Sequence, residues 1–204
     1  MYTPKLYREE DRARILEFLR QNEFATLVTF DGEKPTASHL LMEVVEDGDR
    51  LLVNGHMSRA NPQWKQFEAN IEVLVIFHGP HTYISPTWYD HVNVPTWNYQ
   101  AVHVYGKPRI IEDREASYRL LNNLIERHEA ASHYRLEMLP QDFVEKEMKG
   151  IVAFQIEVTK IEANYKLSQN RNDEDYRNIV AKLDERDDEM SRGVAEAMRE
   201  KRQL

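Results

Sequence analysis

The 204-residue sequence contains no cysteine, which excludes disulfide frameworks, cysteine-based zinc sites and thiol nucleophiles together. The absence of cysteine fits a reducing compartment. Long hydrophobic runs are also missing, because stretches such as IEVLVIF at 71–77 are far too short to cross a bilayer. The opening MYTPKLYREEDRARIL lacks the apolar centre of a signal peptide. We therefore expect a cytoplasmic protein without a membrane segment.

Positive charge is in the minority, with 27 Lys and Arg against 35 Asp and Glu and a net charge of -8. Nucleic-acid backbones are bound through clustered basic side chains. The overall charge therefore argues against direct DNA binding, and we identify no helix-turn-helix or basic recognition helix. The basic groups at 146–149 and 199–202 are expected to be solvated helix faces.

The hydrophobic pattern predicts a mostly β protein of the α+β class, with about six strands. Asp31-Gly32 and Asp47-Gly48 are typical hairpin turns, and Gly79-Pro80 is expected to end a strand. Strands are expected at 24–30, 35–45, 50–54, 71–78, 82–85, 101–111 and 151–163. A closed antiparallel barrel is the expected architecture, since closure removes exposed sheet edges.

Helices are predicted on both sides of these strands. An amphipathic helix is expected at 8–22, a short one from Ser58 to position 70, and another at 113–133 with Asp113 as its N-cap. Further helices are expected at 140–148 and 174–202, the last with a thin apolar stripe at Ile179, Leu183, Met190 and Val194.

The segment 55–64, GHMSRANPQW, has the chemistry of a phosphate site. Backbone N–H groups at a helix start, hydroxyl groups and a guanidinium are the donors that bind phosphate. With Ser58 as the N-cap, Arg59 falls in the first helical turn. An exposed Arg after a Ser cap is also common in helices without a ligand, so the pattern leaves both interpretations open.

Separated motifs across nearly the whole chain resemble the PaiB-type FMN-binding negative transcriptional regulators, within the FMN-binding split-barrel superfamily. They are MYTPKLYREED, PTASHLLM, GHMSRANPQW, YISPTWY, VPTWNYQAVHVYGKP and KLSQNR. The resemblance implies an antiparallel six-stranded split β-barrel with flanking helices and a C-terminal helix. It implies an FMN-binding domain over 1–165, and a linker and helix over 166–204 that pack on the barrel or on a dimer partner.

The resemblance also implies a homodimer with FMN at the subunit interface and assigns site residues. Ser58 and Arg59 face the phosphate, with His56 nearby, although Ala60 stands where related oxidases have a second basic residue. The remaining implied cofactor contacts are Ser38, His39 and Leu40 along the flavin ring, Gln100 on a later strand, Trp88 and Trp97 toward the partner's pocket, and Lys166, Ser168 and Gln169 over the cofactor.

Two other functions stay open. A flavin-dependent oxidoreductase would use the same cofactor, with His39 and Tyr99 as candidate proton donors. A haem-binding split barrel would need an axial ligand such as His56, His78 or His133. The nearest histidine pair, His78 and His81, lacks an acidic residue that would complete a ligand set, so no metal site is expected.

Overall fold

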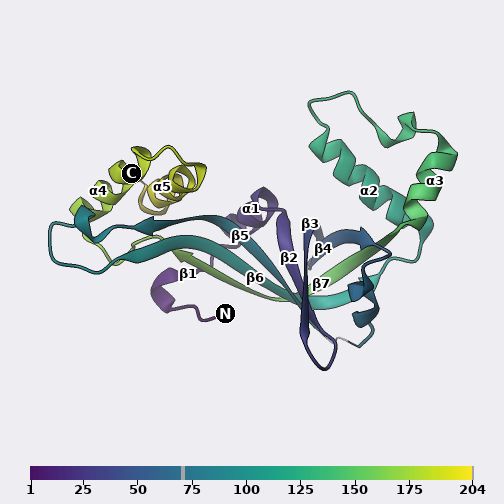
Figure 1. Ribbon diagram of the computed structural model, residues 1–204, viewed down its shortest axis with the longest axis horizontal. Coiled ribbons are helices and arrows are strands. Elements are labelled where there is room, and N and C mark those ends of the chain that lie inside the picture. The colour runs from purple at the N-terminus through teal and green to yellow at the C-terminus, as the bar shows by residue number, and fades with distance from the viewer. Residues whose placement is uncertain (70–71, 204) are drawn as a thin grey trace. The chain divides into compact units, whose positions relative to one another are not determined.

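The computed structural model describes residues 1–69 and 72–203. Its sheet consists of strands β1 (Arg8–Glu9), β2 (Phe24–Phe30), β3 (Pro35–Asp47), β4 (Arg50–Ser58), β5 (Val73–Ile84), β6 (Thr96–Ile110) and β7 (Ile151–Lys166) (Figure 1). The α-helices are α1 (Arg12–Gln21), α2 (Arg114–His128), α3 (Gln141–Lys149), α4 (Asp173–Asp184) and α5 (Glu189–Arg202). Short 3-10 helices are η1 (Lys5–Tyr7), η2 (Pro62–Gln66), η3 (Pro86–Trp88) and η4 (Leu136–Met138).

The strand order is β1-β7-β4-β3-β2-β5-β6, and β6 also pairs with β7. This extra pairing joins the two ends of the order β7-β4-β3-β2-β5-β6. The predicted mostly β, antiparallel fold class is thereby confirmed, with seven strands in the sheet where about six were expected. The two-residue strand β1 adds antiparallel to β7, with Arg8 opposite Asn164.

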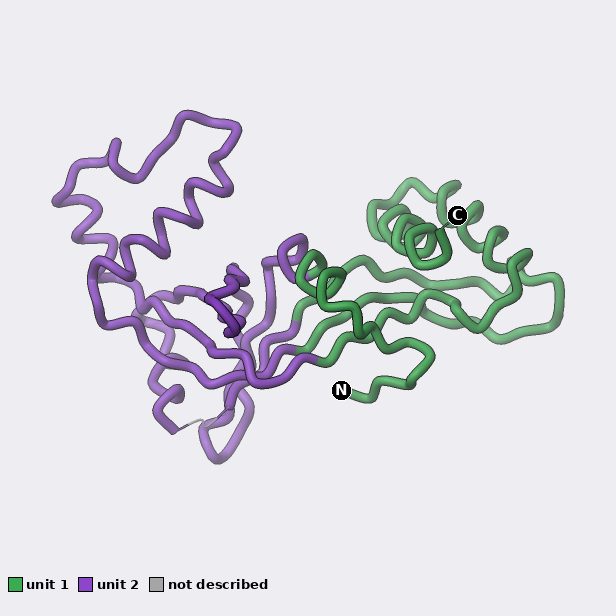
Figure 2. Tube along the Cα trace, turned by 180° about the vertical axis from the view of Figure 1, so that it is seen from behind, with its two compact units in different colours: residues 1–18, 77–103, 162–204 green, residues 19–76, 104–161 purple. Residues whose placement is uncertain are grey.

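The chain divides into two compact units, each described here by itself (Figure 2). One unit contains residues 1–18, 77–103 and 162–204, and the other contains residues 19–76 and 104–161. In the first unit α4 packs on α5, and the fully buried Tyr176 donates its hydroxyl to the Met198 carbonyl at 2.7 Å. In the second unit the core side chains include Leu27, Met42 and Phe154.

Local turn chemistry produces the β2-β3-β4 meander of the second unit. Gly32 and Gly48 have positive φ angles of 99° and 59°, which turns of this kind require. The resulting register places Phe24 opposite Leu41 and Asp47 opposite Arg50. Both predicted hairpins are confirmed.

The expected strand break at Gly79-Pro80 is wrong, because β5 continues through both residues to Ile84. A Cβ at Gly79 would lie 2.4 Å from Cε2 of Phe18, so this glycine permits close packing rather than a turn. Pro80 in turn lies against α5, since a Cβ at Gly193 would lie 2.8 Å from Pro80 Cβ. Strand β5 starts at Val73, so the expected start at Ile71 lies outside the described residues.

The single helix expected at 174–202 is two helices, because Asp188 caps a new start by accepting from Ser191 N at 2.7 Å. Three members of its predicted apolar stripe are buried, but Met190 is 47% exposed. Asp113 caps α2 as predicted, accepting from Ala116 N at 2.7 Å. Helix α2 ends at His128 rather than at position 133. Among the described helices, none has the length and apolar character needed to span a membrane.

Candidate functional site

The turn after β4 differs from the predicted helix start. Strand β4 continues through Ser58, whose hydroxyl accepts from Ala60 N at 3.2 Å. The cap is Asn61, which accepts from Gln63 N at 3.0 Å and begins the 3-10 helix η2. Ser58 as an N-cap was therefore wrong, and Arg59 lies in a turn rather than in a helix. The predicted helix end at position 70 lies outside the described residues.

Two side chains hold this turn against strands β2 and β3. Asn61 Nδ2 donates to Ser38 Oγ at 2.9 Å, which joins the turn to the strand that carries three predicted flavin contacts. Gln63 is fully buried, and its Nε2, with two N–H bonds, lies within hydrogen-bonding distance of three acceptors. These are Leu27 O at 3.2 Å, Thr29 Oγ1 at 3.1 Å and Thr36 O at 3.1 Å. The segment 61–63 (NPQ) therefore holds the turn close to Ser38.

Arg59 makes three contacts with the junction between α3 and β7. Its backbone N–H donates to Gly150 O at 2.8 Å, its Nε to Lys149 O at 2.9 Å, and its Nη2 to Ile151 O at 2.8 Å. A guanidinium has five N–H bonds. The three that remain have no hydrogen-bond partner within residues 1–69 and 72–203. Arg59 is thus oriented by carbonyl groups and keeps donors for an anion.

A hollow of about 490 Å³ lies next to Arg59. Arg59 and Trp64 line it from the turn and η2, and Lys149 lines it from the end of α3. Arg114 also lines it, but this guanidinium is paired with Glu145 at 2.9 Å. The hollow gives a ligand on Arg59 open space inside this unit.

The remaining predicted residues of this unit lie on β3 and β4. His39 Nδ1 lies 3.0 Å from Thr26 Oγ1 on an exposed part of the sheet, and Leu40 is half-buried. His56 is half-buried, and its buried Nδ1 has no hydrogen-bond partner among the described residues. Burial lowers the pKa of His56 below its ordinary value. Such an orphaned polar atom fits a site that receives a polar ligand group.

The other unit holds the predicted aromatic residues. The Arg186 guanidinium lies 4.7 Å from the centre of the Trp88 ring, a cation–π contact. Trp97 is 46% exposed, and its ring centre lies 5.8 Å from His81 and 6.4 Å from Tyr83. The contact of these tryptophans with a partner's pocket stays a prediction.

The KLSQ segment of the same unit makes a turn rather than a free linker. Lys166 Nζ donates to Thr96 Oγ1 at 2.5 Å, and burial, with the nearby Arg171 charge, lowers the pKa of Lys166. Ser168 has a left-handed φ of 59° and is buried against Asn98, with Oγ 2.9 Å from Asn98 Nδ2. The Gln169 side chain accepts from Leu167 N at 2.7 Å. Gln100 is half-buried on β6.

The twelve predicted cofactor contacts therefore fall in two groups, one in each unit. The structure brings Ser38 together with the turn that carries Ser58 and Arg59. It brings Lys166, Ser168 and Gln169 together at the end of β7. Each group is built by contacts within its own unit.

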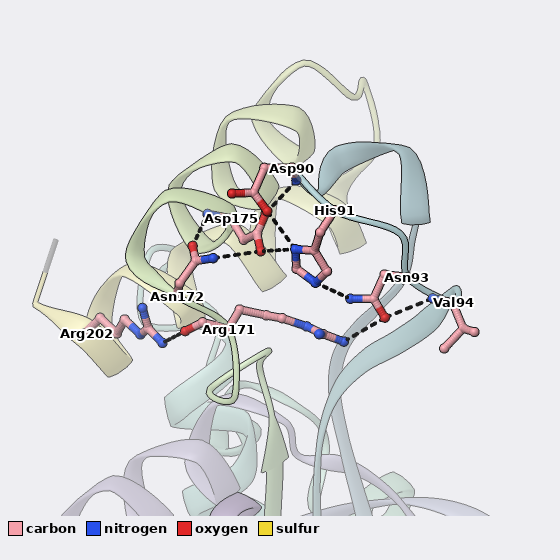
Figure 3. Close-up of polar contacts among 8 residues, drawn as sticks. All are labelled: Asp90, His91, Asn93, Val94, Arg171, Asn172, Asp175 and Arg202. Carbon is pink, nitrogen blue, oxygen red and sulfur yellow. Dashed lines mark hydrogen bonds and ion pairs between the residues drawn. The ribbon is translucent and has the colours of Figure 1, made fainter.

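Sequence reasoning missed a polar network between the loop after η3 and helix α4 (Figure 3). Asp175 is fully buried, accepts from Asp90 N at 3.0 Å and lies 3.4 Å from His91 Nδ1. His91 Nδ1 also lies 2.6 Å from Asp90 Oδ1, and its Nε2 lies 3.2 Å from Asn93 Nδ2. One ligand-type atom from each of Asp90, His91 and Asp175 lies within 4.8 Å of the other two. Asp90 and Asp175 are 85 positions apart, so no local sequence pattern links them.

Comparisons with known proteins agree with this fold. Residues 1–160 match the family described as "Putative FMN-binding domain". The chain is 42% identical over 203 residues to protease synthase and sporulation protein PAI 2 of Bacillus subtilis, covering 98% of each protein.

Two solved structures share the fold with a TM-score of 0.60. The flavocytochrome Anf3 from Azotobacter vinelandii is 15% identical, over 84% of this chain and 75% of that one. The FAD and haem binding protein from Mycobacterium smegmatis is 16% identical, over 84% of this chain and 79% of that one. At these identities the structures show the fold alone.

The fold and the matched family thus define a flavoprotein of the split-barrel class, with FMN as the cofactor that the family description names. Within that class, the chain belongs to the PaiB-type family of FMN-binding proteins.

Proposed function

We propose that this protein is an FMN-dependent negative transcriptional regulator, in which FMN binding to a homodimer changes gene expression. The observation that carries the proposal is the 42% identity, over 98% of both chains, to a protein named for protease synthesis and sporulation. The regulatory role itself rests on that relationship.

Arg59 is the residue proposed to hold the FMN phosphate. The N–H bonds of its guanidinium that make no contact have no partner in the described part of the chain. A hydrogen bond from a guanidinium to a phosphate is charge-assisted, and such bonds are stronger than those between neutral groups. Ser38, His39 and Leu40 would lie along the isoalloxazine ring, with His56 close to the phosphate. The bound cofactor would supply redox chemistry, while the protein's side chains bind and orient it.

The family resemblance also gives cofactor roles to residues of the other unit. Trp88 and Trp97 would face the pocket of the second subunit, and Gln100 would contact the flavin. Lys166, Ser168 and Gln169 would cover the cofactor. Direct contact with DNA is not part of the proposal, because the net charge is -8.

The first test is the cofactor. Freshly purified protein should be yellow, and the released small molecule should have the mass of FMN. Arg59→Ala should weaken FMN binding by about tenfold or more, since a charge-assisted contact contributes roughly 1.5 to 3 kcal/mol. Riboflavin, which lacks the phosphate, should bind the variant as it binds the wild type. An equal loss of affinity for FMN and for riboflavin would contradict the assignment of Arg59 to the phosphate.

The second test is regulation. A Bacillus subtilis strain without its 42% identical relative should recover its normal transcript levels when it expresses this chain. Expression of Arg59→Ala should restore them less. A wild-type chain that binds FMN but changes no transcript would contradict the regulatory part alone, and turnover of a reduced nicotinamide would instead favour an oxidoreductase.

A further inference from the structure

The proposed phosphate position has one cation fewer than related oxidases, because Ala60 follows Arg59 directly. Part of the Arg59 guanidinium is also committed to carbonyl groups at Lys149 and Ile151. A phosphate monoester carries up to two negative charges near neutral pH. A site with Arg59 alone would leave much of that charge without a direct partner.

The C-terminal end of α3 also disfavours a bound phosphate electrostatically. The C-terminus of a helix carries a partial negative charge on its unpaired carbonyl groups, which repels an anion. Arg59 reduces this negative charge, because its Nε donates to Lys149 O and its backbone N–H donates to Gly150 O. A second positive group on this side of the hollow would offset the remaining negative potential at a phosphate beside Arg59.

Three cationic residues line the hollow beside Arg59: Arg59 itself, Arg114 and Lys149. Arg114 is paired with Glu145, and Arg59 is held by the α3–β7 junction. The Lys149 side chain is exposed, and its ammonium has no hydrogen-bond or ion-pair partner in the described part of the chain. Lys149 is also the residue whose carbonyl orients Arg59, so its backbone is fixed next to the guanidinium.

We propose that Lys149 supplies the second cation of the phosphate site, in place of the basic residue absent at position 60. The inference rests on the proposed function, because it assumes that Arg59 binds the FMN phosphate. Three acidic residues, Glu68, Glu112 and Glu145, also line the hollow. Binding therefore depends on direct contacts from Arg59 and Lys149 rather than on a positive field over the whole hollow.

Helix α3 provides a matched control. Lys146 and Lys149 are both exposed lysines in its last turn, but Lys146 does not line the hollow. Lys149→Gln and Lys146→Gln each remove one positive charge from the same helix end. A general effect of net charge or of helix stability would affect both variants alike.

The experiment titrates cofactor-free full-length protein with FMN and with riboflavin by calorimetry. Lys149→Gln should weaken FMN binding by about three- to tenfold, as expected for an exposed charged contact. It should leave riboflavin binding unchanged. Lys149→Arg should restore FMN affinity, and Lys146→Gln should match the wild type for both ligands.

Equal FMN affinities for Lys149→Gln and Lys146→Gln would overturn the assignment, because Lys149 would then be an ordinary solvated lysine. Equal weakening of FMN and riboflavin by Lys149→Gln would also overturn it, since the effect would not involve the phosphate. A wild-type protein that binds riboflavin as tightly as FMN would instead contradict the proposed phosphate position itself. These outcomes therefore distinguish a wrong role for Lys149 from a wrong position for the phosphate.

Discussion

Asn61 donates from Nδ2 to the hydroxyl of Ser38 at 2.9 Å, across 23 positions of sequence. One end of this bond belongs to the turn that carries Arg59, and the other belongs to the strand proposed to lie along the flavin ring. Asn61 also caps η2 through its Oδ1. Asn61, together with Gln63, therefore holds the proposed phosphate and ring contacts next to each other.

Removing either end of this bond should weaken FMN binding without unfolding the protein. Asn61→Ser keeps an N-cap oxygen but loses the Nδ2 amide that donates to Ser38, and Ser38→Ala loses the acceptor. Each should weaken FMN binding by about three- to tenfold, and the double variant should be weaker by no more than either single one. Calorimetric titration of the four proteins measures this coupling. Asn123→Ser, an exposed change on α2, is the control, and additive losses would contradict the link.

Local signals predicted those parts of the fold that depend on neighbouring residues. The Asp31-Gly32 turn, the Asp47-Gly48 turn and the Asp113 cap are interactions over a few positions, so their residue types reveal them. Position 58 was predicted wrongly for the same reason. Ser58 has the right residue type for a cap, but Asn61, three positions later, has it too and precedes a proline.

The contacts that build the site are long-range, and the residue pattern does not encode them. Arg59 reaches carbonyl groups 90 and 92 positions away, and the Asp90 backbone reaches Asp175 across 85 positions. Pairing of this kind depends on strand order and on the placement of α3 and α4. Family resemblance could name Arg59 as a ligand, but it did not indicate that the α3–β7 junction orients it.

Gly55 shows how a glycine can be mistaken for a strand end. It was expected to follow a strand ending at position 54, yet β4 continues through it. A Cβ there would lie 2.6 Å from Phe154 Cζ and 2.9 Å from Met42 Sδ. Gly55→Ala should lower the free energy of unfolding by about 1–3 kcal/mol through overpacking.

Urea denaturation of Gly55→Ala measures this loss. Gly150→Ala is the comparison, because its φ of -80° suits alanine and its Cβ would meet only Glu147 O, at 3.2 Å. A loss at Gly55 no larger than that at Gly150 would show that the core adapts to the extra methyl group.

The buried carboxylate of Asp175 should stabilise the loop that carries His91. Asp175→Asn replaces an acceptor with a donor facing Asn172 Nδ2, which lies 3.1 Å from Oδ2 in the wild type. A buried donor left without an acceptor costs about 1–3 kcal/mol. We expect a loss of that size in the free energy of unfolding and faster amide exchange at Asp90, whose N–H donates to Asp175.

Glu174→Gln controls for the helix dipole in that experiment, because Glu174 is exposed in the same first turn of α4. It should change the free energy of unfolding by only a few tenths of a kcal/mol. Similar losses in both variants would assign the effect to the helix start rather than to the loop.

His56 gives the protein a predicted dependence on pH. Because burial lowers the pKa of His56 in the folded state, the unfolded chain binds a proton more readily than the folded chain does. The stabilisation from neutral His56 is therefore complete above the unfolded pKa of 6.5 and is lost as the pH falls from there toward the folded value. Urea denaturation at pH 7.5 and pH 5.5 should show a larger drop for the wild type than for His56→Gln. The exposed His133→Gln should retain the wild-type drop, and an equal drop in His56→Gln would mean that other groups cause the acid sensitivity.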